Sequence, residues 1–362
     1  MRLSHDETQS LLRDNLRELL QREASFEAVR ACEREGRADA ALWQKLVAHG
    51  WLATPFPAAQ GGGDGGLVEA GILVEEIERR AALVPAAEVL ACALAAQRAG
   101  EGEGARQLVA AALRGECIPV PAVLEASDRF DACSAAVTSD GRLSGEKYFV
   151  DYADFATHHV VAAVRAGERG LYRVAARDPG VKSQGIAAIG RIPRAVVRYD
   201  GVAAERVAGP EGLALLVQVA RALCSAQILA CMQKSLEATV AYTSVREQFG
   251  RPIGSFQAVQ HHAANMAIAV ESARFLVYQA LDALERGDDA EQRVAVAKAA
   301  VSQSAPEVVM LGHQLHGGQG FIEENDLYFF TLRAKDRSLA WGSIEECLDV
   351  VASAVEREED WL

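Results

Sequence analysis

Closely spaced cysteines are missing from this chain of 362 residues. Its seven cysteines are odd in number, and none shows the Cys-x-x-Cys spacing of a zinc or redox site. They stand among alanine, leucine and valine, a setting typical of reduced thiols that pack as small apolar side chains. We therefore expect free, buried cysteines, with neither a disulfide framework nor a metal site.

The sequence also lacks the marks of exported and membrane-spanning proteins. Charged residues interrupt positions 1–20, where a signal peptide would carry an apolar stretch. The uncharged apolar runs all fall short of the roughly 20 residues that cross a bilayer. We expect a cytoplasmic protein without a membrane span.

Positive charge and aromatic residues are both scarce. The chain has 37 Lys and Arg against 50 Asp and Glu, so its net charge of −13 excludes nucleic acid as a general partner. A local basic patch can still hold one small anion. Aromatic residues make up only 6% of a chain that is 50% hydrophobic and rich in alanine and leucine, which favours helices around a large core.

The first stretch, 1–119, carries leucines at helical spacing. A glycine-rich break at 61–66 separates two such segments. It lacks the Lys-Ser/Thr ending of a phosphate-binding P-loop, and no strand precedes it. We interpret this break as an ordinary loop between helices.

The second stretch, 120–209, has a different character. Short runs rich in β-formers are separated by Gly, Pro and Asp, and Asp140-Gly141 predicts a hairpin turn. From 210 to 362 the helical period returns in three long segments, 213–245, 258–286 and 292–311. We predict a mainly α protein with a β insert, composed of an N-terminal α-helical domain, a middle β-domain and a C-terminal four-helix bundle.

Two motifs in the third stretch have the chemistry to bind a phosphorylated, flat ligand. One reads R-E-Q-F-G-R-P-I-G-S-F-Q from Arg246, and the other reads Q-L-H-G-G-Q-G-F from Gln314. A guanidinium matches phosphate oxygens, glutamine amides donate hydrogen bonds, and glycines let backbone N–H groups approach a ligand. The candidate binding residues are Arg246, Gln248, Phe249, Ile253, Phe256, Gln257, Gln314, Leu315, Gly317 and Gly318. The alternative is a helix-end salt bridge at Arg246 and a plain helix C-cap at Gly317-Gly318.

Together these motifs resemble the R-x-x-F-G-x-x-I-x-x-F-Q and Q-x-x-G-G-x-G segments of the acyl-CoA dehydrogenase family. Weaker similarity at Trp43–Gly66 and Gly145–Val150 extends the resemblance over nearly the whole chain. The resemblance implies the acyl-CoA dehydrogenase fold, with a β-barrel or sandwich as its middle domain. It also implies FAD as cofactor, α,β-dehydrogenation of an acyl-CoA substrate, and an electron-transfer flavoprotein as acceptor.

The chain departs from the family where the catalytic base should lie. The family's Y-E-G-T segment is here Ala340-Trp341-Gly342-Ser343, and the indole of Trp341 cannot accept the substrate proton. Some relatives place the base on the first bundle helix, where this chain has Ala220, and no Asp or Glu occurs from 212 to 236. Both usual positions of the base are therefore empty.

The resemblance also shows changes on the flavin side of the β-domain. Asp151 stands where the family has a threonine, and a carboxylate near the flavin edge disfavours the reduced flavin. In this family the retained bundle motifs serve the FAD of a neighbouring subunit, whereas the changed segments serve the subunit's own FAD. We therefore predict the subunit without the catalytic Glu in a heteromeric enzyme. Its substitutions resemble the bacterial branch, with paired subunits, that acts on steroid side-chain thioesters.

Two alternatives remain. A self-sufficient homotetramer would need a displaced base, for which Asp151 is the first candidate, followed by Glu125, Glu345 and Glu346. A flavin-free scaffold subunit would need no base. His316, inside the glycine motif, is a further candidate for contact with a ligand phosphate.

Overall fold

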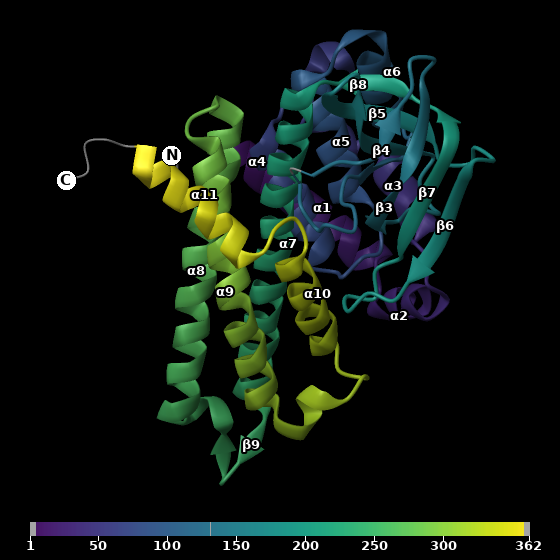
Figure 1. Ribbon diagram of the computed structural model, residues 1–362. Helices are drawn as coiled ribbons and strands as arrows, with labels where there is room; N and C mark the ends of the chain where they lie inside the picture. The colour runs from purple at the N-terminus through teal and green to yellow at the C-terminus, as the bar shows by residue number, and fades with distance from the viewer. Residues whose placement is uncertain (1–4, 131, 358–362) are drawn as a thin grey trace. The chain divides into compact units, whose positions relative to one another are not determined.

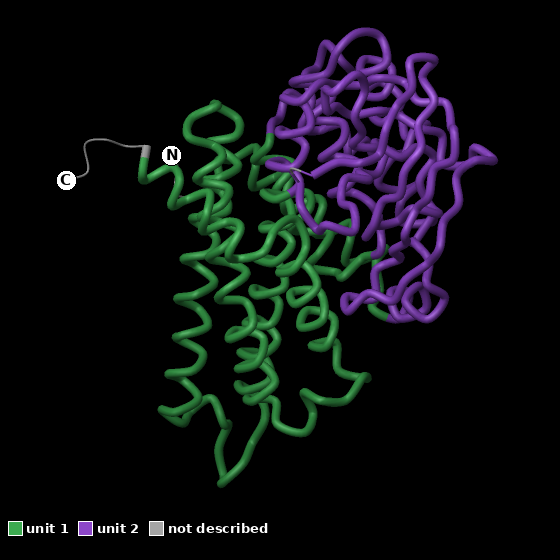
Figure 2. Tube along the Cα trace, viewed as in Figure 1, with its two compact units in different colours: residues 1–26, 67–82, 221–362 green, residues 27–66, 83–220 purple. Residues whose placement is uncertain are grey.

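The structure is a computed structural model that describes residues 5–130 and 132–357 (Figure 1). The chain forms two compact units, each drawn from separate parts of the sequence (Figure 2). Unit 1 combines Met1–Phe26, Leu67–Ala82 and Arg221–Leu362, and unit 2 combines Glu27–Gly66 and Leu83–Ala220. Because these units interleave the sequence, the three consecutive domains 1–119, 120–209 and 210–362 remain a prediction.

Unit 1 is helical. Its elements are α1 (Glu7–Glu23), α4 (Leu67–Glu78), the part of α7 (Pro210–Val245) from Arg221 onward, α8 (Gln257–Arg286), α9 (Ala290–His316), α10 (Leu327–Leu339) and α11 (Ile344–Arg357). Helix α9 packs against α8, α10 and α11 (Figure 1). The three long helical segments expected from the sequence are confirmed as α7, α8 and α9.

Helix α4 is buried although it is rich in charge. Glu76 pairs with Arg17 of α1, and Arg79 donates hydrogen bonds to Gln233 at 2.9 Å and to Glu237 at 2.8 Å on α7. A buried charge is costly unless it is paired and hydrogen-bonded. These pairs therefore fix the register of α4 against α1 and α7.

Two helices have the length and apolarity of membrane-spanning segments. They are Pro210–Val245, with a mean hydropathy of 1.7, and Ala290–Phe321, with a mean hydropathy of 1.2. The apolar windows are 83% and 56% buried inside the protein, and the core helices of folded domains have the same length and composition. The expected absence of a membrane span therefore remains a prediction.

Unit 2 joins short helices to a mixed, mostly antiparallel sheet. Its helices are α2 (Phe26–Glu35), α3 (Ala40–Ala48), α5 (Ala86–Ala99) and α6 (Gly102–Leu113), and its strands are β1 (Pro119–Ala122), β2 (Ala136–Val137), β3 (Arg142–Asp151), β4 (His158–Arg165), β5 (Glu168–Ala175), β6 (Val181–Ile186), β7 (Arg194–Ala203) and β8 (Glu205–Ala208). The strand order is β6-β7-β3-β2-β4-β5-β8, and β1 and β2 both run parallel to β4. The hairpin turn expected at Asp140-Gly141 is confirmed between β2 and β3.

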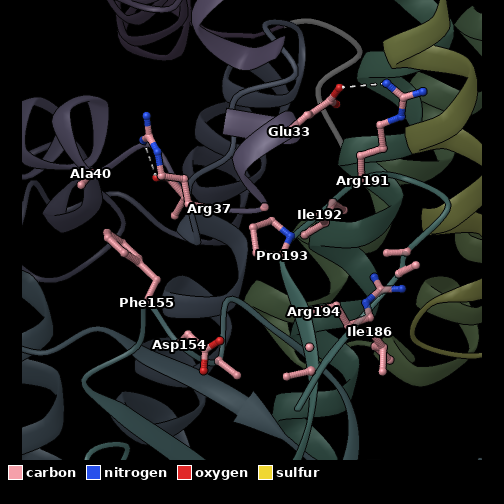
Figure 3. Close-up of a pocket in the computed structure, with 17 residues that line it drawn as sticks. Glu33, Arg37, Ala40, Asp154, Phe155, Ile186, Arg191, Ile192, Pro193 and Arg194 are labelled. Carbon is pink, nitrogen blue, oxygen red and sulfur yellow. Dashed lines mark hydrogen bonds and ion pairs between the residues drawn. The ribbon is translucent and has the colours of Figure 1, made fainter. Parts of the chain in front are cut away.

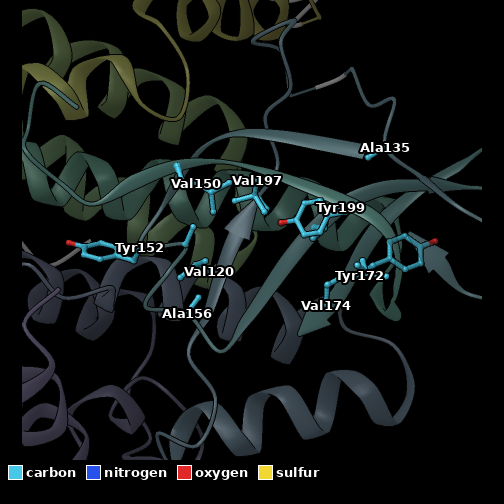
Figure 4. Close-up of a cluster of buried hydrophobic side chains, with 14 of the residues drawn as sticks. Val120, Ala135, Val150, Tyr152, Ala156, Tyr172, Val174, Val197 and Tyr199 are labelled. Carbon is cyan, nitrogen blue, oxygen red and sulfur yellow. The ribbon is translucent and has the colours of Figure 1, made fainter. Parts of the chain in front are cut away.

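The core of the β-domain consists of the side chains on one face of this sheet. Val150, Val174, Val197 and Tyr199 contribute to it (Figure 4), and each is at most 2% exposed. Successive strand residues point to opposite faces, so alternation along β7 buries every second side chain over much of the strand. The expected state of the cysteines is also confirmed, because all seven are free and all but Cys133 are buried.

A buried ion pair closes the segment between β1 and β2. Lys147 on β3 is fully buried and donates to Glu125 at 2.7 Å, and Glu125 also accepts from the backbone N–H groups of Ser134 and Ala135. Burial alone would raise the pKa of Glu125, but the hydrogen bonds from Lys147, Ser134 and Ala135 lower it from 4.5 to about 2. The carboxylate is thus ionised and its acceptor positions are occupied.

Glu125 should give the β-domain a pH-dependent stability. Its folded pKa lies below its unfolded value, so it stabilises the protein fully above about pH 4.5, and that contribution disappears as the pH falls towards 2. We expect Glu125→Gln, which leaves Lys147 buried without its counter-ion, to lower the free energy of unfolding by about 3–5 kcal/mol at neutral pH and by much less at about pH 3. Urea unfolding at both pH values measures this difference.

Glu103→Gln is the matched control, because Glu103 pairs with Arg106 on the exposed surface of α6. Its effect should stay below about 1 kcal/mol at either pH. An equal loss of stability at both pH values in Glu125→Gln would contradict the assignment.

Candidate functional site

The first motif forms a strained hairpin after α7. Strands β9 (Glu247–Gln248) and β10 (Arg251–Pro252) pair across a turn in which Phe249 has φ 55° and Gly250 has φ 77°. Positive φ at both central residues suits the twist of a two-residue hairpin, but the left-handed conformation costs a bulky residue roughly 1–3 kcal/mol. The ring of Phe249 is nevertheless 91% exposed. Strain combined with exposure points to a functional role for this ring.

Aromatic and cationic side chains give the hairpin its shape. The rings of Phe249 and Phe256 pack in a T-shaped arrangement with centroids 6.1 Å apart. The Arg251 guanidinium lies over the Phe256 ring, 4.1 Å from its centroid. The backbone N–H of Ile253 donates to the carbonyl of Arg246 at 2.8 Å and closes the loop. Ile253 and Phe256 are therefore partly buried supports, and the residues around them face outward.

The polar residues of this motif are open to solvent. Arg246, Gln248 and Gln257 are all exposed. Across residues 5–130 and 132–357, the guanidinium of Arg246 takes part in no ion pair or side-chain hydrogen bond. The salt-bridge alternative for Arg246 is thus not supported, and its planar set of donors is available to an anion.

The second motif lies at the end of α9. Gly317 has φ 58° and ψ −140°, a conformation essentially restricted to glycine, and it forms the C-cap by donating to the carbonyl of Gln314. A Cβ atom added at Gly317 or Gly318 would have no neighbour within 4 Å. Gln314 is exposed, and Leu315 is half-buried. The glycines therefore cap the helix and also leave bare backbone open to a ligand.

The two motifs come together at one end of the bundle, where the hairpin and the α9–α10 connection both lie (Figure 1). Tyr242 near the end of α7 stacks on His316 at the end of α9, with ring centroids 4.5 Å apart. His316 is buried and its Nδ1 bonds to the carbonyl of Gly312, so its ring links helices and does not face solvent. We call residues 245–257 and 314–322 the bundle-end segments.

Large apolar side chains are exposed in the same segments. They are Val245, Phe249, Phe321 and Ile322. Exposed apolar groups beside a phosphate-compatible arginine and open glycine backbone are typical of a surface that binds another molecule. The bundle-end segments can therefore bind a flat, phosphorylated ligand and pack against a partner.

The turn between α10 and α11 contains Trp341, the residue that the sequence resemblance aligns with the family's base. Trp341 has φ 59°, and its carbonyl accepts from Arg221 Nε at 2.8 Å. Lys298 is fully buried and donates from Nζ to the carbonyls of Ser338, at 3.1 Å, and Gly342, at 3.2 Å. Burial lowers the pKa of Lys298. Two buried cations thus hold the turn by its backbone, while its apex presents an indole.

The neighbouring carboxylates have structural partners. Ser343 and Glu346 form a reciprocal cap at the start of α11, in which Ser343 N donates to Glu346 at 2.8 Å. Glu345 is exposed on the same first turn. At the alternative base position, Ala220 contributes only a buried methyl group. The turn itself therefore carries no free acid.

The flavin-side position of the β-domain is also occupied by an ion pair. Asp151 ends β3, and both of its oxygens accept from the guanidinium of Arg194 on β7. Such a two-point pair fixes the orientation of the carboxylate and commits one lone pair of each oxygen to Arg194. Close by, Phe149 lies in a register shift of β3 with φ 55° and a ring that is 48% exposed.

Unit 2 contains a cavity of about 590 Å³ (Figure 3). Its wall includes the apolar side chains of Phe155, Ile186 and Ile192. Two of its charged groups, Glu33 and Arg191, lie 3.7 Å apart as an ion pair. The other two arginines of the wall, Arg37 and Arg194, pair with carboxylates outside the lining, Glu35 and Asp151.

Four cations that hold these segments through hydrogen bonds were not predicted from the sequence. Arg221 and Lys298 are single charges within otherwise apolar helical segments, and that pattern was a usable signal for burial. Lys147 and Arg194 stand in strands with ordinary alternation, where nothing in the sequence marks their partners.

Comparisons with known proteins agree with the fold. The family models for the N-terminal and C-terminal domains of acyl-CoA dehydrogenase match residues 6–116 and 214–356. The acyl-CoA dehydrogenase FadE27 of Mycobacterium tuberculosis is 30% identical over 323 residues, which cover 85% of this chain and 86% of FadE27. The two matched regions lie before and after the β-domain, and they correspond to the two helical parts that the sequence predicts.

Two solved structures are similar over nearly their whole length. A steroid ACAD variant named Tcur3481-Tcur3483 has a TM-score of 0.90 and 31% identity, covering 97% of this chain and 98% of that one. The ChsE4-ChsE5 complex from Mycobacterium tuberculosis has a TM-score of 0.90 and 27% identity, covering 99% of both chains. The expected fold, an N-terminal helical domain, a middle β-domain and a C-terminal helical bundle, is therefore confirmed. This chain belongs to the acyl-CoA dehydrogenase family, whose members are oxidoreductases that act on the CH–CH groups of acyl-CoA thioesters.

Proposed function

We propose that this chain is the subunit without a catalytic base in a heteromeric, FAD-dependent acyl-CoA dehydrogenase. A second acyl-CoA dehydrogenase chain supplies the base and the acyl site, and this chain completes the FAD site through its bundle-end segments. The observation that carries the proposal is a contrast between two regions. Within residues 5–130 and 132–357 the bundle end offers an exposed Arg246 without an ion pair, whereas the two usual positions of the base carry Trp341 and Ala220, and Asp151 is paired with Arg194.

The bundle-end segments fit a dinucleotide cofactor. Arg246 would hold the pyrophosphate with its planar donors, and the amides of Gln257 and Gln314 would donate to neighbouring oxygens. The open backbone at Gly317 and Gly318 would add N–H donors, and the exposed Phe249 ring would lie against a flat ring. FAD, when bound, supplies the two-electron acceptor for α,β-dehydrogenation.

The chain's own catalytic positions support a role without proton transfer. Trp341 can donate through its indole N–H but cannot accept the α-proton of a thioester. Asp151 has both oxygens on Arg194, and Glu125 has its oxygens on Lys147 and backbone N–H groups. Removal of the proton is therefore assigned to the partner chain.

The names of the structural relatives support a paired enzyme. ChsE4-ChsE5 is a complex of two named chains, and Tcur3481-Tcur3483 is described as a steroid ACAD. On this basis we assign the substrate to CoA thioesters of steroid side chains and the assembly to a tetramer of two chain types. Electron-transfer flavoprotein is the proposed acceptor, and the cytoplasm is the proposed location.

Two other functions make different predictions. A self-sufficient homotetramer would use a displaced base, with Asp151 as the first residue to replace. A flavin-free scaffold would bind no FAD in any assembly, although it would have little use for an exposed and unpaired Arg246.

Co-purification tests the proposal. The chain is purified alone and together with the product of the gene beside its own, and flavin absorbance, solution mass and acyl-CoA oxidation are recorded. We expect flavin and activity only in the complex, with one FAD for each pair of chains. A yellow, active tetramer of this chain alone would overturn the proposal in favour of the homotetramer, and a colourless complex would favour the scaffold.

Arg246 should determine how tightly the complex holds FAD. Replacement by alanine removes a charge-assisted contact worth about 1.5–3 kcal/mol, so we expect Arg246→Ala to weaken FAD binding roughly 10- to 100-fold. Arg286→Ala is the control, because Arg286 is exposed on the same bundle and pairs only with Asp282 one helical turn away. FAD titration of each complex after removal of bound flavin gives the affinities. Unchanged affinity in Arg246→Ala would contradict its role.

A further inference from the structure

A buried histidine, His313, contacts the inner end of the glycine loop through the carbonyl of Gly320. His313 lies on α9 one position before the exposed Gln314, and its ring points into the protein. Nδ1 lies 2.7 Å from the carbonyl oxygen of Gly320, and Nε2 lies 2.6 Å from Thr331 Oγ1 on α10. The ring of Phe321 covers the imidazole at a centroid distance of 5.2 Å.

The partners of His313 define its tautomer. A carbonyl oxygen only accepts, so Nδ1 carries the proton and donates it to Gly320. Burial lowers the pKa of His313, which keeps the ring neutral near pH 7 and leaves Nε2 as an acceptor. Thr331 then donates its hydroxyl proton to Nε2 at 2.6 Å in preference to the Leu327 carbonyl at 3.3 Å.

Gly320 also fits closely against α9. A Cβ atom at this position would lie 3.0 Å from both the carbonyl oxygen of His313 and the Cβ atom of His316. The close approach brings the Gly320 carbonyl within reach of the imidazole. On the other side of the same loop, Gly317 and Gly318 remain open. The loop therefore has a fixed inner end and a bare outer surface.

We propose that His313 is a positioning residue for FAD: its hydrogen bond to Gly320, oriented by Thr331, holds the loop Gly317–Phe321 so that the backbone at Gly317 and Gly318 meets the cofactor. This role rests on the proposed function of the bundle-end segments. His313 does not touch the cofactor, and it acts only through the loop. Without the hydrogen bond, the loop samples other conformations and the cofactor's contacts are lost for part of the time.

Substitutions in the complex test this role through the rate of FAD release, followed by the rise in flavin fluorescence. Loss of one buried hydrogen bond and of the loop's anchor should make release roughly tenfold faster in His313→Leu. Thr331→Val, which removes the hydroxyl that orients the ring, should have a smaller effect in the same direction. His313→Gln can still donate to Gly320, and it should restore part of the lost retention.

Two matched controls separate positioning from general loss of structure. Ser304→Ala removes a hydroxyl on the same helix that bonds only to the Ala300 carbonyl, and His49→Leu removes an exposed histidine in unit 2. Neither should change FAD release. Subunit assembly and the thermal midpoint are measured for all variants, since a purely structural role would change these quantities and FAD release together.

Hydrogen exchange of the chain alone gives a readout that does not depend on FAD. Peptides that cover 317–326 should exchange faster in His313→Leu than in the wild type, whereas peptides from the middle of α8 should not change. A wild-type complex that binds FAD, with unchanged release in His313→Leu, overturns this inference and leaves the proposed function intact. A wild-type complex without FAD overturns both, whatever the exchange shows.

Discussion

Charge buried in an apolar interior needs a partner, and this constraint determines the form of the turn at Trp341. Arg221 and Lys298 lie inside the helical unit, where an unpaired ion would cost several kcal/mol. They bind the carbonyls of Trp341 and Gly342. These two contacts fix the turn through its backbone carbonyls. Because these contacts involve backbone atoms, they do not require a particular side chain at position 341.

The same constraint separates the buried charges from the exposed Arg246. In the β-domain Glu125 and Asp151 are each held by a cation of their own unit, Lys147 and Arg194. Arg246 is different, because its guanidinium is exposed and unpaired within the part of the chain that the structure describes. The buried charges form ion pairs that stabilise the protein itself. An exposed cation near open glycine backbone is available to another molecule, which is the arrangement that the proposed function requires.

Much of this arrangement follows from the sequence. Helical periodicity predicted α7, α8 and α9, and turn residues with β-rich runs predicted the β-domain, because local patterns determine local structure. Most residues of the two predicted binding motifs are exposed, and their role in binding stays a prediction. The ion pairs were not predictable. Asp151 and Arg194 are 43 positions apart, and their contact depends on the pairing of β3 with β7, which no local pattern encodes. For the same reason Asp151 looked like a candidate base in the sequence.

Backbone strain marks segments whose conformation is not explained by the stability of the fold alone. Phe249 adopts a left-handed conformation that costs roughly 1–3 kcal/mol. Its ring is almost fully exposed, so burial of the ring does not offset this cost. Gly317 similarly takes a conformation essentially restricted to glycine at a point where a side chain would meet no obstacle. Gly317 also caps α9, and Phe249 also forms the hairpin turn, so each feature has a local structural role as well. Their presence in the two segments that flank Arg246 and Gln314 is accounted for when a bound cofactor or partner supplies the missing contacts.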